Sequence, residues 1–146
     1  MNFSFVLLGL GTSFGALVMY QRWPKNQATP IGFWLLALSG IGVMLAGIWP
    51  ENTNGFIHIF GAGLAFILGN LSLVFLSQAT VLSKTWRIYT LFSGLVGLLA
   101  LVLLVTQHYL GLGAGALERI VDYPRVIWLI VTGFYTLRTE LKLPAA

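Results

Sequence analysis

The sequence predicts an all-α fold, a polytopic transmembrane helix bundle with five transmembrane helices that forms a single domain over residues 1–146. Of these 146 residues, 58% are hydrophobic and only 8% are charged, and the mean hydropathy is +0.88. A water-soluble domain of this size could not cover so much apolar surface. The eight lysine and arginine residues fall singly where apolar stretches end, as membrane anchors do. We therefore expect membrane lipids as partners, and no nucleic acid.

Five apolar segments are long enough to cross a bilayer, whose core of about 30 Å needs about 20 helical residues. The predicted spans are Phe3–Tyr20, Ile31–Trp49, Phe56–Leu76, Ile88–Gln107 and Tyr123–Leu137. The first should remain as a helix in the membrane, because no basic segment precedes it and no cleavage pattern follows it.

The fifth predicted span is the weakest, because charged residues stand at both of its ends. Arg125 and Arg138 are separated by about 18 Å of helix at 1.5 Å per residue. Both arginines are therefore expected to extend outward to the interface, or the bilayer is expected to thin around this span. Asp122, just before Pro124, is the predicted N-terminal cap of this helix.

The basic residues also predict the orientation in a cell membrane. Arg22 and Lys25 follow the first predicted span, Lys84 and Arg87 follow the third, and the tail carries Arg138 and Lys142, whereas the linker after the second span has no basic residue. Positive-inside reasoning places the N-terminus outside and the C-terminus in the cytoplasm. Aromatic residues agree with this assignment. Those expected at the inner ends are Tyr20, Trp23, Trp34, Trp86, Tyr89 and Tyr135, and those expected at the outer ends are Trp49, Phe56, Tyr109, Tyr123 and Trp128.

Small residues spaced by four predict close helix packing, since they let backbones approach one another in lipid. The pairs are Gly11 with Gly15, Gly42 with Ala46, Gly61 with Ala65, and Ser93 with Gly97. If the Gly11–Gly15 face stays exposed, it could pair with a second copy or with another membrane subunit. Asn70 is expected to hold helices together through Thr12, Ser13 or Ser39.

Polar residues gather at the predicted outer side, where any chemistry is expected. The candidate ligand-binding residues are Glu51, His58, His108, Glu118 and Arg119. His58 shares a helix face with small apolar residues, so it should point into the bundle, where an ionisable group is a functional candidate. The alternative is that His58 only ties the linker at Trp49-Pro50 to a backbone carbonyl or to Glu51.

Cofactor and metal chemistry have little support. Cysteine is absent, which excludes thiolate metal sites and cysteine nucleophiles. His58 and His108 could hold a haem or a metal together with Glu51 or Glu118, but no third histidine exists. We expect neither a metal nor a cofactor. The glycines at Gly111–Gly115 lack the lysine and hydroxyl residues of a phosphate loop, so they predict an outer loop that leads to an interfacial turn at Leu117–Val121.

The pair Glu118-Arg119 leaves two interpretations open. An acid and a base at a membrane interface could clamp a lipid headgroup, or they could pair with each other and with Arg125.

Several short motifs carry a family resemblance. Asn2-Phe3 opens a glycine-bearing helix, Ile48-Trp49-Pro50-Glu51 is followed by His58, and Leu117-Glu118-Arg119-Ile120 leads to Trp128 and Arg138. In these motifs the chain resembles an uncharacterised membrane family, domain of unknown function 998, and more distantly the Frag1/DRAM/Sfk1 group. The resemblance implies an outer-face constellation of Pro50, Glu51, His58, Glu118 and Arg119. It also implies six helices, of which this chain would lack the first, but no established reaction.

Three classes of function remain open. The first, which the polar distribution favours, is a small membrane protein that binds a lipid headgroup, an amphiphile or a partner subunit at its outer face. The second is an intramembrane enzyme, with His58 as general acid or base, Glu51 or Glu118 orienting it and Arg119 holding an anion. The third is a small channel or transporter, for which polar residues at several depths would be expected. The sequence does not decide whether the protein is an enzyme.

Overall fold

A computed structural model confirms the all-α fold and describes residues 2–23, 27–79 and 82–140. In these residues the helices are α1 (Asn2–Arg22), α2 (Ala28–Ile48), α3 (Glu51–Leu76), α4 (Lys84–Val105) and α5 (Ala114–Glu140). All five are long and apolar enough to cross a membrane. Lys25 and Lys142, two residues of the predicted inner charge set, lie outside the described residues, as does the side chain of Arg22.

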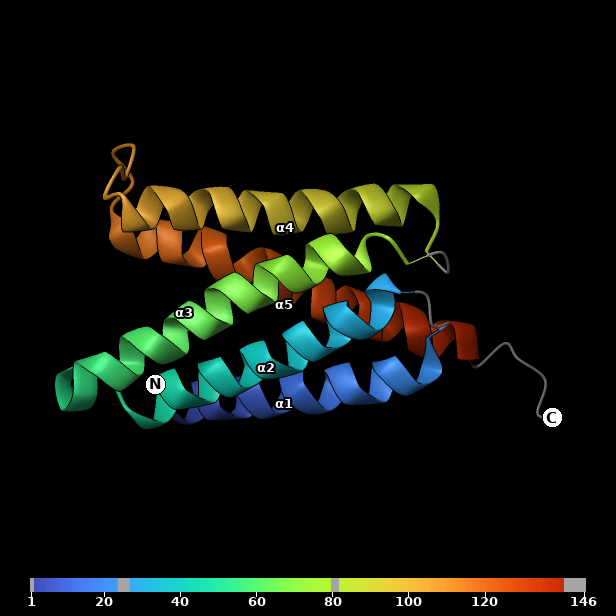
Figure 1. The fold of residues 1–146 in the computed structure, drawn as a ribbon, viewed down its shortest axis with the longest axis horizontal. Helices are drawn as coiled ribbons and strands as arrows, with labels where there is room; N and C mark the ends of the chain where they lie inside the picture. The colour runs from blue at the N-terminus through green and yellow to red at the C-terminus, as the bar shows by residue number, and fades with distance from the viewer. Residues whose placement is uncertain (1, 24–26, 80–81, 141–146) are drawn as a thin grey trace.

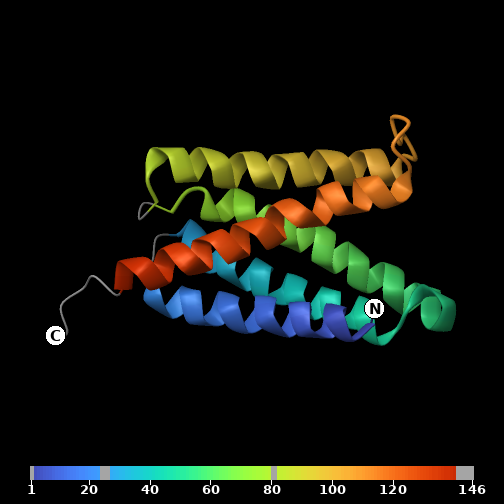
Figure 2. The same ribbon diagram turned by 180° about the vertical axis from the view of Figure 1, so that it is seen from behind.

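The helices pack mainly on their neighbours in the chain, and α5 also contacts α3 (Figure 1). Seen from behind, α5 runs obliquely across the bundle, from beside α4 toward the side where α1 lies (Figure 2). The start of α1, the α2–α3 junction and the α4–α5 loop share one end of the bundle. We name this end the N-terminal face.

The contact between α2 and α3 depends on small residues, as the sequence predicted. A Cβ on Gly42 would lie 2.6 Å from the carbonyl oxygen of Gly61, and a Cβ on Gly61 would lie 2.8 Å from the backbone nitrogen of Ala46. Helices α1 and α2 approach in the same way, since a Cβ on Gly9 would lie 2.5 Å from the carbonyl oxygen of Gly40. These backbones come so close that a methyl group would force them apart.

Helix α3 begins earlier than the predicted Phe56, but it contains a break. Asn54 has the non-helical angles φ −152° and ψ 90°, so the first turn at Glu51 is set off from the rest of the helix. The side-chain oxygen of Asn54 accepts a hydrogen bond from the backbone N–H of Ile57, 3.2 Å away. Asn54 thus acts as an N-terminal cap for the long part of α3.

The predicted start of the fifth helix was wrong. Helix α5 begins at Ala114, so the expected interfacial turn at Leu117–Val121 is helical, and Asp122 lies inside the helix rather than at its cap. Pro124 lies inside the helix as well. Glu118, Arg119 and Asp122 interrupt the apolar run here, but the buried Leu117 and Val121 keep the segment in the bundle.

The main core lies in the half of the bundle away from the N-terminal face. Its buried residues are Ala16, Met19, Trp23, Phe33, Leu36, Ala37, Leu73, Leu76, Ala79, Leu82 and Trp128. Trp128 was expected at the outer interface, but it is fully buried and donates from Nε1 to the Thr90 hydroxyl at 2.8 Å. The earlier start of α5 carries Trp128 deeper into the bundle than predicted.

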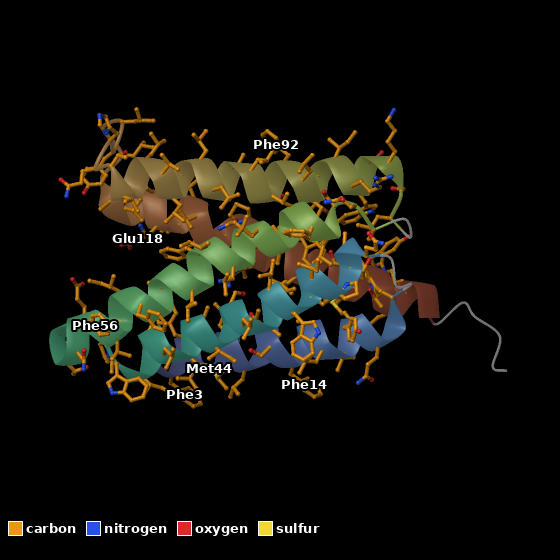
Figure 3. The ribbon with its side chains drawn as sticks, in the orientation of Figure 1. Phe3, Phe14, Met44, Phe56, Phe92 and Glu118 are labelled. Carbon is orange, nitrogen blue, oxygen red and sulfur yellow. The ribbon has the colours of Figure 1, made fainter. Side chains whose placement is uncertain are left out.

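Apolar side chains that face away from the bundle cover its flanks, as expected for contact with lipid. Phe14 on α1 and Phe92 on α4 point outward on opposite sides (Figure 3), with 71% and 67% of their surface exposed. Arg87 was expected only as a charge marker, but its Nε also donates to the carbonyl oxygen of Ser77 at 3.0 Å. This bond satisfies a backbone acceptor just past the end of α3.

Candidate functional site

A cavity of about 430 Å³ lies near the N-terminal face, lined by residues of α1, α2, α3 and α5. Its polar lining residues are His58 from α3 and Glu118, Arg119 and Asp122 from α5. The label on Glu118 marks this part of α5 in Figure 3. Its other lining residues are Phe5, Val43, Ala46, Ala62, Ala65, Phe66, Gly115 and Tyr123. Charged groups of both signs thus meet an apolar wall in one space, which we call the head cavity.

Glu118 and Arg119 both line the head cavity, but they form no ion pair with each other in the described part of the chain. Consecutive residues of an α-helix project about 100° apart, which keeps the two heads separate. Arg119 donates from Nη1 to the carbonyl oxygen of Gly115 at 3.0 Å, which leaves its other N–H groups for a ligand. Glu118 is exposed and has no basic partner in the described residues.

Asp122 is the third charged residue of the head cavity, and the buried Arg125 neutralises its charge. Arg125 is 1% exposed and forms an ion pair with Asp122 on the same face of α5. A second donor of Arg125, Nη1, lies 3.1 Å from the Ser39 hydroxyl of α2. Gly69 of α3 leaves room for the arginine, because a Cβ there would lie 2.6 Å from Arg125 Cδ.

The predicted outward extension of Arg125 was therefore wrong. The residue lies near the middle of the apolar span Ala114–Arg138, too deep for its head to reach the interface. A charge at this depth requires a partner, and Asp122 supplies it. Sequence reasoning missed this pair, although the three-residue spacing of Asp122 and Arg125 on a helix was the available signal.

His58 both lines the head cavity and tethers the start of α3. Its Nδ1 lies 3.1 Å from the carbonyl oxygen of Ala46 and 3.3 Å from that of Trp49. Carbonyl oxygens can only accept, so Nδ1 carries the hydrogen and Nε2 of a neutral ring remains an acceptor. The backbone tether expected from the sequence is present, with carbonyls rather than Glu51 as partners.

Glu51 and His108 are not among the residues that line the head cavity. Glu51 is exposed in the first turn of α3, and His108 is exposed just after α4, with Nδ1 2.9 Å from the carbonyl oxygen of Thr106. The start of α3 and the end of α4 lie on opposite sides of the bundle in Figure 1. Among the described residues, no group of three or more metal-ligating side chains comes together.

Asn70 joins α3 to α5 below the cavity. Its Nδ2 donates to the carbonyl oxygens of Phe66 at 2.8 Å and Val121 at 3.0 Å, so its partner helix is α5 and not the expected α1 or α2. Its Oδ1 is buried without a hydrogen-bond partner in the described structure, next to Gly97 of α4. This amide therefore ties α3 to α5 beside Asp122, a residue that lines the cavity.

The fold and the site together define a small multi-pass helical membrane protein with a charged, apolar-walled cavity at one end of its bundle. The chain belongs to the family described as Protein of unknown function (DUF998), which matches residues 1–135. No curated protein and no solved structure matches it.

Proposed function

We propose that the head cavity binds the polar headgroup of a membrane amphiphile, and that the N-terminal face is the outer face of a cell membrane. One observation carries the proposal: an acid and a base that are not paired with each other line the same cavity as Val43, Ala62 and Phe66. Such a mixture suits a molecule that is charged at one end and apolar at the other.

The two charge signs favour a headgroup that carries both an amine and a phosphate. Arg119 offers a planar set of donors that matches phosphate oxygens. Glu118 and the free Nε2 of His58 offer acceptors for an ammonium group or a hydroxyl. Asp122 contributes less, because Arg125 already neutralises it. Phosphoethanolamine is a headgroup with this chemistry.

The same geometry favours binding over catalysis. The enzyme hypothesis assigns Glu51 or Glu118 to orient His58, whereas its Nδ1 contacts the backbone carbonyls of Ala46 and Trp49. No serine or threonine lines the head cavity, and cysteine is absent from the chain. A channel would need polar groups along its whole length, but the space below Asp122 is filled by the buried side chain of Arg125.

Native mass spectrometry of the protein, purified from nanodiscs that contain equal amounts of phosphatidylethanolamine and phosphatidylglycerol, tests the proposal. We expect retained phosphatidylethanolamine to fall at least about tenfold in Glu118→Gln and in Arg119→Gln, because a hydrogen bond to a charged group contributes about 1.5–3 kcal/mol. Glu51→Gln is the matched control, since it removes the same charge outside the cavity. Equal retention in all three variants would refute headgroup binding.

The proposed orientation has its own test, which the absence of cysteine makes simple. A single cysteine introduced as Leu112→Cys lies in the exposed α4–α5 loop of the N-terminal face, and one introduced as Arg138→Cys lies at the other end. A membrane-impermeant maleimide added to intact cells should label only the first. Labelling of Arg138→Cys alone would reverse the orientation.

A further inference from the structure

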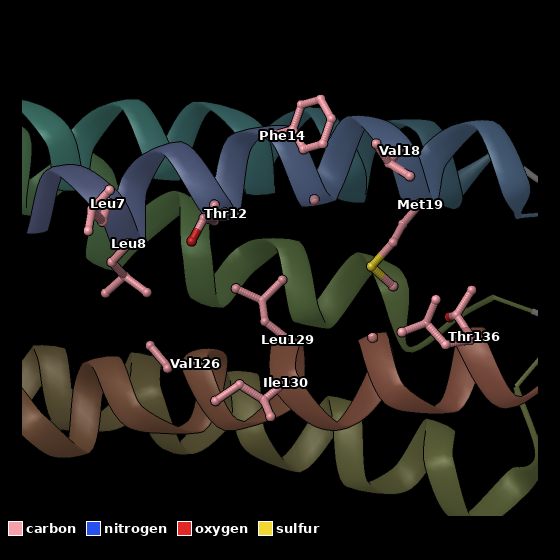
Figure 4. A pocket seen from close by; sticks show the side chains of 14 residues that line it. Leu7, Leu8, Thr12, Phe14, Val18, Met19, Val126, Leu129, Ile130 and Thr136 are labelled. Carbon is pink, nitrogen blue, oxygen red and sulfur yellow. The ribbon is translucent and has the colours of Figure 1, made fainter. Parts of the chain in front are cut away.

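A second, larger hollow lies between α1 and α5. It has a volume of about 600 Å³, and only these two helices line it. Figure 4 shows α1 and α5 as its two walls, with Met19 and Leu129 pointing into the space between them. Its walls are formed by Leu7, Leu8, Gly11, Thr12, Phe14, Gly15, Val18, Met19, Val126, Leu129, Ile130, Gly133, Thr136 and Leu137. We call it the tail groove.

Glycines make the tail groove wide. A Cβ built on Gly11, Gly15 or Gly133 would meet nothing within 4 Å, in contrast to the crowded glycines between α2 and α3. The Gly11–Gly15 pair therefore does not serve helix contacts within the described chain. Its effect is to leave space beside α5.

The residues that line the tail groove follow those that line the head cavity along both α1 and α5. On α5, Asp122 lines the head cavity, and Val126, one turn further along, lines the tail groove. On α1, Phe5 lines the head cavity and Leu8, almost one turn further, lines the tail groove. Residues three or four apart share a helix face, so each helix presents one continuous stripe to both spaces.

The length and polarity of the tail groove match a hydrocarbon chain. From Leu7 to Met19 the wall of α1 extends about 18 Å at 1.5 Å per residue, which is long enough for the acyl chain of one leaflet, since half of a bilayer core measures about 15 Å. No charged residue lines the groove, and its hydroxyls are those of Thr12 and Thr136. The Thr136 hydroxyl is engaged, since it donates to the carbonyl oxygen of Thr132 at 2.9 Å.

We infer that the tail groove holds one acyl chain of the same amphiphile whose headgroup occupies the head cavity. This inference rests on the proposed function and extends it: the ligand is a phospholipid with an amine-bearing headgroup and a chain about one leaflet long. Lipid tails surround the whole protein, so an apolar groove alone gains little selectivity. The charges of Glu118 and Arg119 select the molecule, and the groove fixes where its chain lies.

Photocrosslinking tests the inference with a phosphatidylethanolamine that carries a diazirine in one acyl chain. In nanodiscs we expect peptides of α1 and α5 that contain Leu8, Val126 and Ile130 to be labelled preferentially. Labelling of these peptides should fall at least about fivefold in Glu118→Gln, although this residue does not line the tail groove. It should fall likewise in the double variant Gly11→Leu/Gly15→Leu, which fills the groove.

Gly63→Leu is the matched control for the groove, because a Cβ on Gly63 also meets nothing within 4 Å and this residue lines neither space. It should leave the labelling unchanged. If Glu118→Gln abolishes phosphatidylethanolamine retention while acyl labelling stays spread over all helices, the tail groove is refuted and the proposed function stands. If retention itself is insensitive to Glu118→Gln, both fail together.

A second copy of the chain docked at the tail groove would also overturn the inference. Native mass spectrometry would then show a dimer that Gly11→Leu/Gly15→Leu disrupts. Thr12→Val separates the two occupants further, because the Thr12 hydroxyl is buried and has no partner within the described chain. Loss of that hydroxyl should leave acyl labelling intact, whereas a partner helix bonded to it would dissociate.

Discussion

Replacing Asp122 with asparagine should strongly destabilise the protein, because the change leaves the guanidinium of Arg125 buried without its counter-charge. Arg125 is 1% exposed, and its only other hydrogen bond in the described residues goes to the neutral Ser39 hydroxyl. Breaking a buried ion pair from one side costs about 3–5 kcal/mol. A cation near the middle of a membrane helix costs about 2.5–3.5 kcal/mol on insertion scales, which is the same size. We therefore expect the free energy of unfolding to fall by about 3–4 kcal/mol.

The assay is equilibrium unfolding in mixed micelles with increasing dodecyl sulfate, followed by circular dichroism and by the fluorescence of the tryptophans. Glu118→Gln removes the same charge one helical turn away, where no ion pair forms in the described chain, and should change stability by less than about 0.5 kcal/mol. The double variant Asp122→Leu/Arg125→Met should recover to within about 1 kcal/mol of the wild type, because an apolar pair needs no partner. An Asp122→Asn variant as stable as the wild type would refute the buried-charge argument.

Three further predictions concern the packing that positions the site. Gly42→Ala should destabilise the bundle by about 1–3 kcal/mol in the same unfolding assay, since its Cβ would lie 2.6 Å from backbone atoms of α3. Gly63→Ala is the control and should be tolerated, because its Cβ would meet nothing within 4 Å. Equal effects of the two substitutions would contradict the close contact. Trp128→Phe should lower the free energy of unfolding by about 1–3 kcal/mol, because the buried Thr90 hydroxyl loses the N–H that donates to it. Adding Thr90→Val to this variant should lower the free energy of unfolding only a little further. Asn54→Ala should lower the free energy of unfolding by about 1 kcal/mol, because it removes the N-terminal cap of α3. Amide hydrogen exchange at the start of α3 should then become faster, and unchanged exchange would argue against the cap.

Hydropathy was sufficient to predict the number of helices and most of their extents, because lipid exposure requires long apolar segments. It failed at the start of α5, where Glu118, Arg119 and Asp122 lower the local hydropathy enough to resemble a loop. Helical periodicity was the better signal there. Leu117 and Val121 recur at a spacing of four and are both buried, as one face of a helix requires.

The candidate site was predicted in part, and the limit was set by contacts between distant segments. His58, Glu118 and Arg119 do share one cavity, because the short α2–α3 junction and the α4–α5 loop bring their helices to the same face. Glu51 and His108 lie at the same end of the bundle but on opposite sides of it, and neither lines that cavity. Polar residues at the same depth in the membrane converge only if their helices are rotated so that they face one another. Hydropathy does not determine this rotation.

Asp122 belongs to both the cavity and the interior, and this double role decides which variants can report on binding. Its carboxylate lines the head cavity, yet it is also the counter-charge of Arg125. Loss of lipid in Asp122→Asn would therefore follow from unfolding as readily as from a lost contact. Glu118 and Arg119 carry no such structural duty in the described chain, since neither forms an ion pair there. Retention that falls in Glu118→Gln at unchanged stability can only come from the cavity itself, which makes this variant the decisive one for the proposed function.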